Sequence, residues 1–135
     1  MNSEAQRHGG AEHECNALTD IIISCAIEIH RQLGPGLLES AYEECMCYEL
    51  SSRKIAFERQ KPLPLEYKGI KLDCGYRVDI IVNGKVLLEL KCVEKILPIH
   101  EAQLLTYLKL SKLHLGLILN FHTPLMKSGI KRMAL

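Results

Sequence analysis

The chain has 135 residues, 47% of them hydrophobic, and a formal net charge of +1 at pH 7. This length and composition suit one domain with a single core of ordinary size. The small net charge disfavours a protein that holds long duplex nucleic acid through many phosphate contacts, because such binding depends on a basic excess.

The chain also lacks the sequence features of membrane and secreted proteins. No apolar run approaches the roughly 20 residues that span a bilayer, and the first residues, MNSEAQRHGG, lack the apolar segment of a signal peptide. The six cysteines include no C-x-x-C pair, which predicts neither a zinc ribbon nor a disulfide framework. We therefore expect a cytoplasmic protein whose thiols are reduced and mostly buried.

The N-terminal part of the chain divides into a polar segment and two helices. Residues 1–16 show no hydrophobic periodicity, so we expect a disordered tail there and a single domain over residues 17–135. From about Leu18, apolar residues recur at helical spacing until Gly34-Pro35, which predicts a first helix. A second helix is expected over residues 37–53.

Glu39 lies in the first turn of this second helix. An acid at that position stabilises a helix by closing a capping box or by complementing the helix dipole. Its position alone therefore favours a structural role, and Tyr42, one turn later, is by default an aromatic core residue. One carboxylate can also serve a structural and a functional role together.

Residues Tyr76 to Cys92, YRVDIIVNGKVLLELKC, predict a β-hairpin around which the fold is organised. Two β-branched and aliphatic runs flank Asn83-Gly84, which is a strong turn signal. Asp79 interrupts the first run, while Glu89 and Lys91 lie two residues apart in the second, so the pleat sends both to one face. Charges in core strands are costly unless they pair, bind a cation or face a cleft that water reaches.

The length of the hairpin loop decides whether these charges meet. A two-residue turn at Asn83-Gly84 sets Asp79 opposite Leu88, which puts Asp79 and Glu89 on opposite faces. A three-residue loop from Asn83 to Lys85, or a bulge, sets Asp79 opposite Glu89. We predict the second register, because it separates the apolar from the charged residues.

Further strands and a third helix complete the predicted pattern. Strands are expected over residues 55–60, 63–68, 70–74 and 113–120, an edge strand over 130–135, and the third helix over 99–112. The strand over 113–120 is almost continuously apolar, which favours an internal position in the sheet. In the third helix His100, Gln103 and Tyr107 share one flank, where polar residues often do no more than hydrogen-bond a sheet.

Three motifs resemble those of known protein families. Asp79 followed by Glu89-Leu90-Lys91 resembles the catalytic core of the PD-(D/E)XK nuclease superfamily. Gly36-Leu37-Leu38-Glu39-Ser40-Ala41-Tyr42 looks like the signature of the GxxExxY protein family, and Gln103-Leu104-Leu105-Thr106-Tyr107 is similar to the Gln-x-x-x-Tyr helix motif of exonuclease-like members. The resemblance covers roughly Leu18 to the C-terminus. It implies an α/β, restriction-endonuclease-like fold, with a mixed central sheet flanked by helices and the site at one end of the central hairpin.

The same resemblance implies metal-dependent cleavage of phosphodiester bonds. Asp79, Glu89 and the backbone carbonyl of Leu90 would bind Mg²⁺ or Mn²⁺, because these cations prefer hard oxygen ligands. Lys91 would orient or deprotonate the attacking water and stabilise the developing anion. The other implied active-site residues are Glu39, as a further ligand directly or through water, and the supporting residues Gln103 and Tyr107.

We therefore expect a Mg²⁺- or Mn²⁺-dependent nuclease. The alternative is a nucleic-acid or protein-binding module that keeps the nuclease fold without turnover, because two acids and one base can neutralise each other without a metal. Weak or structure-dependent binding of nucleic acid is expected, because local positive charge is limited to a few groups such as Lys109, Lys112, Lys127, Lys131 and Arg132. We expect no membrane association and leave a homodimer or a larger protein partner open.

Overall fold

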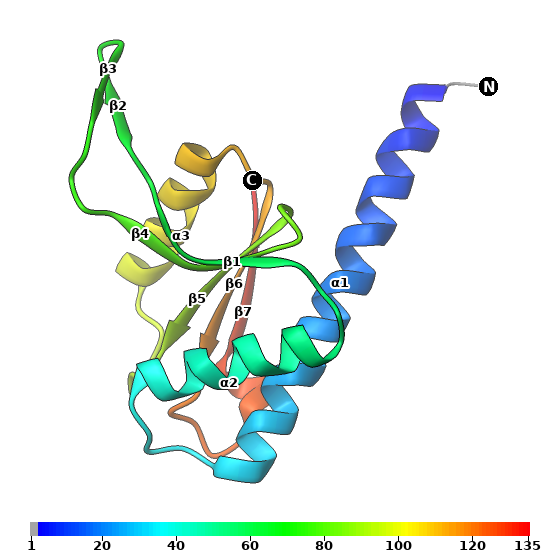
Figure 1. Cartoon of the computed structure of the whole chain (residues 1–135), viewed down its shortest axis with the longest axis vertical. Helices are drawn as coiled ribbons and strands as arrows, with labels where there is room; N and C mark the ends of the chain where they lie inside the picture. The colour runs from blue at the N-terminus through cyan, green and yellow to red at the C-terminus, as the bar shows by residue number, and fades with distance from the viewer. Residues whose placement is uncertain (1–2) are drawn as a thin grey trace.

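The computed structural model describes residues 3–135, with side chains from residue 14 onward, and has a mixed α/β architecture. Its helices are α1 (Ser3–Leu33), α2 (Glu39–Ser52), α3 (Pro98–Ser111) and the short 3₁₀ helix η1 (Met126–Gly129). Its strands are β1 (Phe57–Pro62), β2 (Leu65–Tyr67), β3 (Ile70–Leu72), β4 (Arg77–Val82), β5 (Val86–Lys91), β6 (Leu115–Asn120) and β7 (Ile130–Ala134). Five strands form one sheet in the order β1-β4-β5-β6-β7, and β2 and β3 form a separate hairpin (Figure 1).

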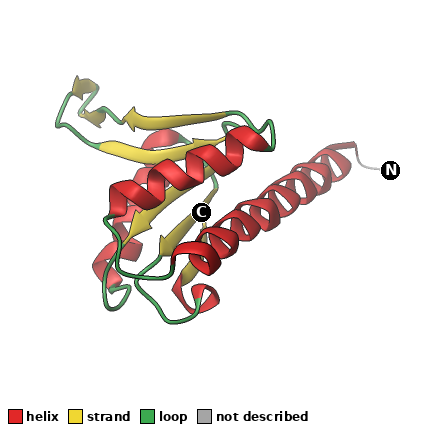
Figure 2. Ribbon diagram, turned by 60° about the horizontal axis from the view of Figure 1, so that its bottom comes forward, coloured by secondary structure: helices red, strands yellow, loops and turns green. Residues whose placement is uncertain are grey.

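The main sheet is mixed and is covered by helices on both faces. Strand β4 runs antiparallel to β1 and β5, β5 runs parallel to β6, and β7 runs antiparallel to β6. Helices α1 and α2 pack on one face and α3 packs on the other (Figure 2). The predicted fold class, a restriction-endonuclease-like mixed sheet flanked by helices, is confirmed.

Alternation along the central strands divides the core into two layers. On the α1 and α2 side, the sheet contributes residues such as Ile80, Leu88 and Leu117. On the α3 side, Ile81 and Leu87 pack with the apolar stripe of α3. Strands with both faces buried need apolar residues at nearly every position, which explains why all six residues of β6 are buried. The internal position predicted for this strand is confirmed, as is the edge position of β7.

Helix α1 begins much earlier than the sequence predicts. It starts at Ser3, whereas the predicted start near Leu18 is wrong, and its N-terminal part extends beyond the sheet (Figure 1). Glu14 forms an ion pair with Lys85 in the β4–β5 loop. The early segment has no apolar stripe, so hydrophobic periodicity could not reveal it. Residues 1 and 2 of the predicted tail lie outside the described residues, and the division into tail and domain stays a prediction.

Helix α1 has 31 residues, yet no helix in the described part of the chain is both long and apolar enough to span a bilayer.

The connection from α1 to α2 is fixed by one buried tyrosine. Tyr42 is fully buried, and its hydroxyl donates to the carbonyl of Gly34 at 2.5 Å and accepts the N–H of Leu37 at 3.2 Å. Its ring stacks on Phe121 with centroids 4.3 Å apart. Gly36 in this connection has φ +106°, a conformation that favours glycine. The core position predicted for Tyr42 is confirmed, and this side chain sets where α2 begins.

The β4–β5 hairpin adopts the predicted register. Val82 pairs with Val86, and Ile80 pairs with Leu88, so the loop holds three residues from Asn83 to Lys85. Asn83 and Gly84 both have positive φ, at 52° and 63°, as a tight loop of this kind requires. The three-residue loop is therefore confirmed.

Candidate active site

Strands β4 and β5 part immediately beyond the Ile80–Leu88 pair, and two carboxylates lie at this opening. The next residues in register, Asp79 and Glu89, are not paired through the backbone ladder. Instead, the N–H of Leu90 donates to Oδ2 of Asp79 at 2.8 Å, and the N–H of Asp79 makes a longer contact of 3.4 Å with Oε1 of Glu89. Side-chain oxygens thus replace backbone acceptors where the strands separate, which brings the two acids together.

Burial and mutual repulsion make these carboxylates reluctant to ionise together. Glu89 is only 7% exposed, and burial, followed by the charge of Asp79, raises its pKa to about 8. Burial also raises the pKa of Asp79, against the lowering effect of the hydrogen bond from the Leu90 N–H. The nearby ammonium of Lys91, the last residue of β5, favours the ionised form of Glu89. When Asp79 and Glu89 are both ionised, the cluster carries more negative charge than Lys91 alone neutralises.

Glu39 approaches the same cluster from the first turn of α2. The residue is exposed, yet partial burial of its carboxylate and the charge of Asp79 raise its pKa. Lys91 and a hydrogen bond from the Cys92 backbone act in the opposite direction. The N-cap of α2 is Leu38, which makes no side-chain capping bond, so the capping box that position suggests is not formed. At the end of β5, Glu39, Asp79, Glu89 and Lys91 lie near enough for their charges to influence one another.

Helix α3 places two of the predicted supporting residues on the other side of Glu89. Gln103 donates its amide to the hydroxyl of Tyr107 at 3.1 Å, and Tyr107 is 7% exposed. Burial first, and then the charge of Glu89, raise the pKa of the Tyr107 hydroxyl. His100, on the same flank, accepts the Leu97 N–H through Nδ1 at 3.0 Å and so caps α3.

A comparison with protein-family models adds evidence from almost the whole sequence. Residues 16–133 match the sequence model of the PD-(D/E)XK nuclease superfamily. The chain belongs to the PD-(D/E)XK nuclease superfamily. A search of curated proteins and a search of solved structures each found no match. Membership of this superfamily indicates a nuclease, and hence a hydrolase that acts on nucleic acid.

As expected for a PD-(D/E)XK nuclease, the donor set suits a hard divalent cation. The carboxylates of Asp79 and Glu89 have raised pKa values, and a bound cation would offset the repulsion between their ionised forms. Carboxylate oxygens are also the ligands that Mg²⁺ and Mn²⁺ prefer. Within the described residues, no three His, Cys, Asp or Glu side chains are arranged as a ready metal-binding group. Two carboxylates completed by a backbone carbonyl, water and substrate are nevertheless a usual set for Mg²⁺.

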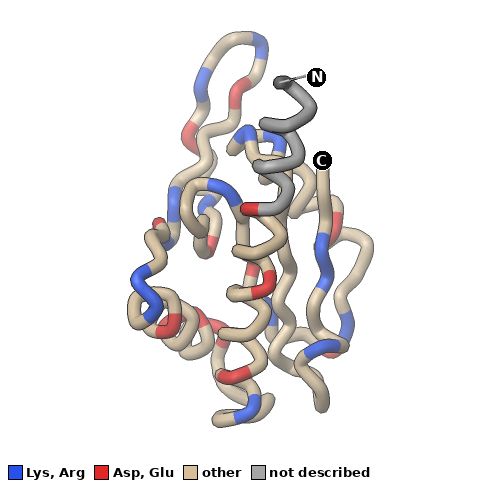
Figure 3. Tube along the Cα trace, turned by 90° about the vertical axis from the view of Figure 1, so that its right-hand side faces the viewer, with Lys and Arg blue, Asp and Glu red and all other residues tan. Residues whose placement is uncertain are grey.

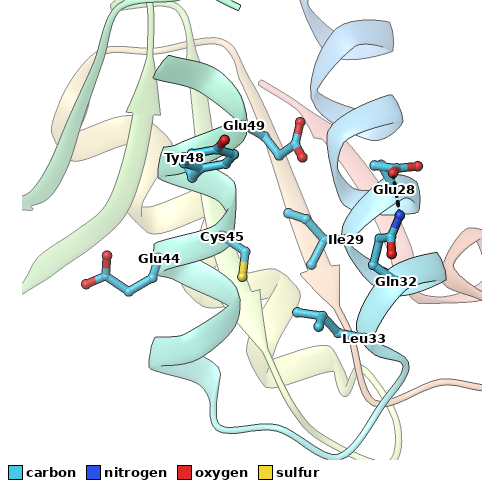
Figure 4. Close-up of a pocket in the computed structure, with 8 residues that line it drawn as sticks. All are labelled: Glu28, Ile29, Gln32, Leu33, Glu44, Cys45, Tyr48 and Glu49. Carbon is cyan, nitrogen blue, oxygen red and sulfur yellow. Dashed lines mark hydrogen bonds between the residues drawn. The ribbon is translucent and has the colours of Figure 1, made fainter. Parts of the chain in front are cut away.

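A groove lies elsewhere on the protein, away from the carboxylate cluster. A hollow of about 440 Å³ separates α1 from α2 (Figure 4). Its lining residues are Glu28, Ile29, Gln32, Leu33, Glu44, Cys45, Tyr48 and Glu49. None of the predicted site residues lines this groove.

Three polar residues beside the cluster were not predicted from the sequence. Glu43, one turn after Glu39, is 7% exposed and accepts hydrogen bonds from Arg59 and Gln60 of β1, each at 2.6 Å. A spacing of four residues on α2 was the available signal for Glu43. Nothing in the local pattern of β1 marks Arg59 or Gln60, because their partners lie 16 and 17 residues away in the chain.

Proposed function

We propose that this protein is a Mg²⁺- or Mn²⁺-dependent nuclease of the GxxExxY type. The observation that carries the proposal is the convergence of Asp79, Glu89 and Lys91 where β4 and β5 part, in a chain of the PD-(D/E)XK superfamily. Buried acids of this kind seldom stabilise a fold better than apolar residues do, so their position within core strands supports a functional role.

In this proposal the carboxylates of Asp79 and Glu89 and the backbone carbonyl of Leu90 hold the cation. Glu39 adds a ligand directly or through water. When bound, the cation supplies positive charge that neutralises the phosphate and stabilises the transition state. The protein fixes the two carboxylates beforehand, through the Leu90 N–H and the register of the hairpin.

Lys91, together with Gln103 and Tyr107 of α3, acts on the reacting groups. Lys91 orients or deprotonates the attacking water and stabilises the anion that develops on phosphorus oxygens. The amide of Gln103 occupies an acceptor position of the Tyr107 hydroxyl, so the hydroxyl proton can be donated to Glu89 or to a phosphate oxygen. Gln103 and Tyr107 are therefore supporting residues of the site.

The conformation of the α1–α2 connection supports the assignment to the GxxExxY family. Gly36 adopts the positive φ that the connection needs, and Tyr42 fixes the same connection through its hydroxyl. Glu39, between them, then lies at the start of α2, near enough to Asp79 for that charge to raise its pKa. Gly36 and Tyr42 of the motif therefore both help to position the carboxylate of Glu39, the third residue that defines it.

Weak or structure-dependent binding of nucleic acid fits the distribution of charge. Figure 3 shows Lys and Arg interspersed with Asp and Glu along the described chain. Two basic residues of β7 are already engaged, because Lys131 pairs with Glu101 at 3.3 Å and Arg132 donates to Asn16 at 2.7 Å. Fewer free cations imply fewer phosphate contacts and a shallow dependence of affinity on salt. A homodimer or a protein partner would supply further contacts.

The proposed location is the cytoplasm. All six cysteines are free thiols, which suits a reducing compartment.

A non-catalytic binding module is the second candidate function. It is favoured by one observation: Asp79 already accepts the Leu90 N–H, so its charge is partly satisfied without a cation. Such a module would keep the carboxylate cluster as a structural feature of the sheet opening.

A cleavage assay separates the two functions. Purified protein is incubated with single-stranded, duplex and branched DNA and RNA in Mg²⁺, in Mn²⁺ or in EDTA, beside Lys91→Ala. A nuclease produces fragments only with metal and only with Lys91 present. Binding of any of these substrates without cleavage in either metal would instead support the module.

Divalent metal is also expected to stabilise the fold through Asp79 and Glu89. A ligand that binds only the native state raises the free energy of unfolding by about 2.7 kcal/mol at a hundred times its dissociation constant. Thermal melts of the wild type should therefore shift upward with Mn²⁺ or Mg²⁺. Asp79→Asn and Glu89→Gln should lose most of this shift; a response equal to that of the wild type would refute the assigned ligands.

A further inference from the structure

Strand β1 has a backbone irregularity directly opposite Asp79. Arg59 pairs with Ile80 and Lys61 pairs with Val78, but Gln60 and Asp79, which lie between these pairs, are not paired. Gln60 has φ +52°, in the left-handed region that residues other than glycine seldom adopt within a strand. Such a conformation persists where surrounding contacts impose it, and it recurs at functional sites.

The contacts that impose this conformation run from α2 to the candidate metal ligand. The amide of Gln60 donates to Oε1 of Glu43 at 2.6 Å and lies 3.4 Å from Oδ1 of Asp79. The other oxygen of Glu43 accepts the Nε–H of Arg59 at 2.6 Å, and Arg59 also pairs with Glu44 at 2.8 Å. Glu43 is therefore a buried carboxylate held on both oxygens, and it fixes the direction of the Gln60 amide.

We propose that Gln60 is a positioning residue for Asp79. Its amide, directed by Glu43, holds Oδ1 of Asp79 on one side, while the N–H of Leu90 holds Oδ2 on the other. The inference rests on the proposed function, in which Asp79 binds the divalent cation. A residue that orients a ligand in this way acts on metal affinity without touching the metal or the substrate.

The chemistry of a glutamine suits this role. A lysine or arginine at position 60 would hold a carboxylate more strongly, but its positive charge would repel the cation that the carboxylate is to bind. An amide donates a hydrogen bond and adds no net charge. Arg59, which does carry a charge, is directed to Glu43 and Glu44, and hydrogen bonds to these two acids raise its pKa further.

Gln60→Gly tests the proposal while keeping the backbone conformation. Glycine adopts φ +52° without steric cost, so the irregularity of β1 is retained and only the amide is lost. The dissociation constant for Mn²⁺, measured by titration calorimetry on the metal-free protein, should rise about 10- to 100-fold. Turnover at saturating Mn²⁺ should stay close to that of the wild type. Gln60→Asn keeps an amide and tolerates this φ, so it should recover part of the affinity.

Lys54→Gly is the matched control. Lys54 also has positive φ, at 59°, but lies in the α2–β1 connection and outside the cluster. Its replacement should leave the Mn²⁺ dissociation constant unchanged. If Gln60→Gly does not fold, Glu43→Gln gives the same readout, because it removes the charge that directs the Gln60 amide.

The outcomes separate this inference from the proposed function. Wild-type affinity for Mn²⁺ in a folded Gln60→Gly or Glu43→Gln variant would overturn the positioning role and leave the nuclease proposal standing. A wild-type protein that binds no Mn²⁺ would overturn both. Equal weakening in Gln60→Gly and Lys54→Gly would mean that backbone stability, and not the amide, controls affinity, and would also overturn the role.

Discussion

Lys91→Ala is expected to reduce the rate of cleavage by about 10²-fold or more at saturating metal, with little change in the affinity for substrate. Lys91 ends β5 beside Glu39 and Glu89, and its charge lowers the pKa of both. A positioned ammonium group contributes most where negative charge develops, which is in the transition state. Single-turnover kinetics with separately measured binding would divide the two effects.

The controls for this prediction come from the same segment and the same cluster. Lys95→Ala removes an exposed ammonium four residues further along the chain and should leave cleavage unchanged. Asp79→Asn should lose metal binding and turnover together, because it removes a ligand and not a proton-transfer group. A Lys91→Ala variant that cleaves as fast as the wild type would exclude the role given to Lys91.

The register of the hairpin could be predicted because one loop length separates its charged residues from its apolar ones. With a two-residue loop, Asp79 would lie opposite Leu88 and the two acids would point to opposite faces of the sheet, so the positions of the charges determined the loop length. The burial of Tyr42 was also predictable, because the apolar stripe of a helix faces the core in a small domain. Patterns of this kind are local, and the energy that enforces them is burial of apolar surface.

Contacts between distant elements could not be predicted in this way. The left-handed conformation of Gln60 depends on Glu43 of α2 and Asp79 of β4, and no property of β1 alone requires it. The parting of β4 and β5 beyond Ile80 likewise reflects the side-chain acceptor of Asp79, which a regular ladder would not use.

Glu39 shows how far the role of a single residue can be predicted from the sequence. Its sequence position allowed a capping box, which requires a suitable side chain at the N-cap, and that position is occupied by Leu38. Only the placement of α2 against the sheet brings the Glu39 carboxylate toward Asp79. Its role as a ligand stays a prediction, and the metal-binding measurements on the cluster are the means to test it.

The stability of the metal-free protein should fall as pH rises from about 4.5 to about 8, because of Glu89. Burial raises the pKa of Glu89 from 4.5 to about 8 in the folded chain. In this window the native state binds a proton that the unfolded state has lost, so unfolding becomes more favourable as pH increases. At about 1.4 kcal/mol per pKa unit, the loss is at most about 5 kcal/mol. Burial raises the pKa of Asp79 in the same direction and adds to the effect.

Chemical denaturation between pH 5 and pH 8 in EDTA measures this loss, and Glu89→Gln is its matched variant. Glutamine has nearly the same shape and no titrating proton, so the unfolding free energy of Glu89→Gln should depend much less on pH over this range. Exposed acids whose pKa is lowered by ion pairs, such as Glu28, are common to both proteins and cancel in the comparison. Mn²⁺ at pH 8 should restore stability to the wild type but not to Glu89→Gln, because a cation replaces the proton only where both carboxylates remain. Parallel pH curves for the two proteins would show that Glu89 is ionised without cost, and the argument for a cation at this site would lose its electrostatic basis.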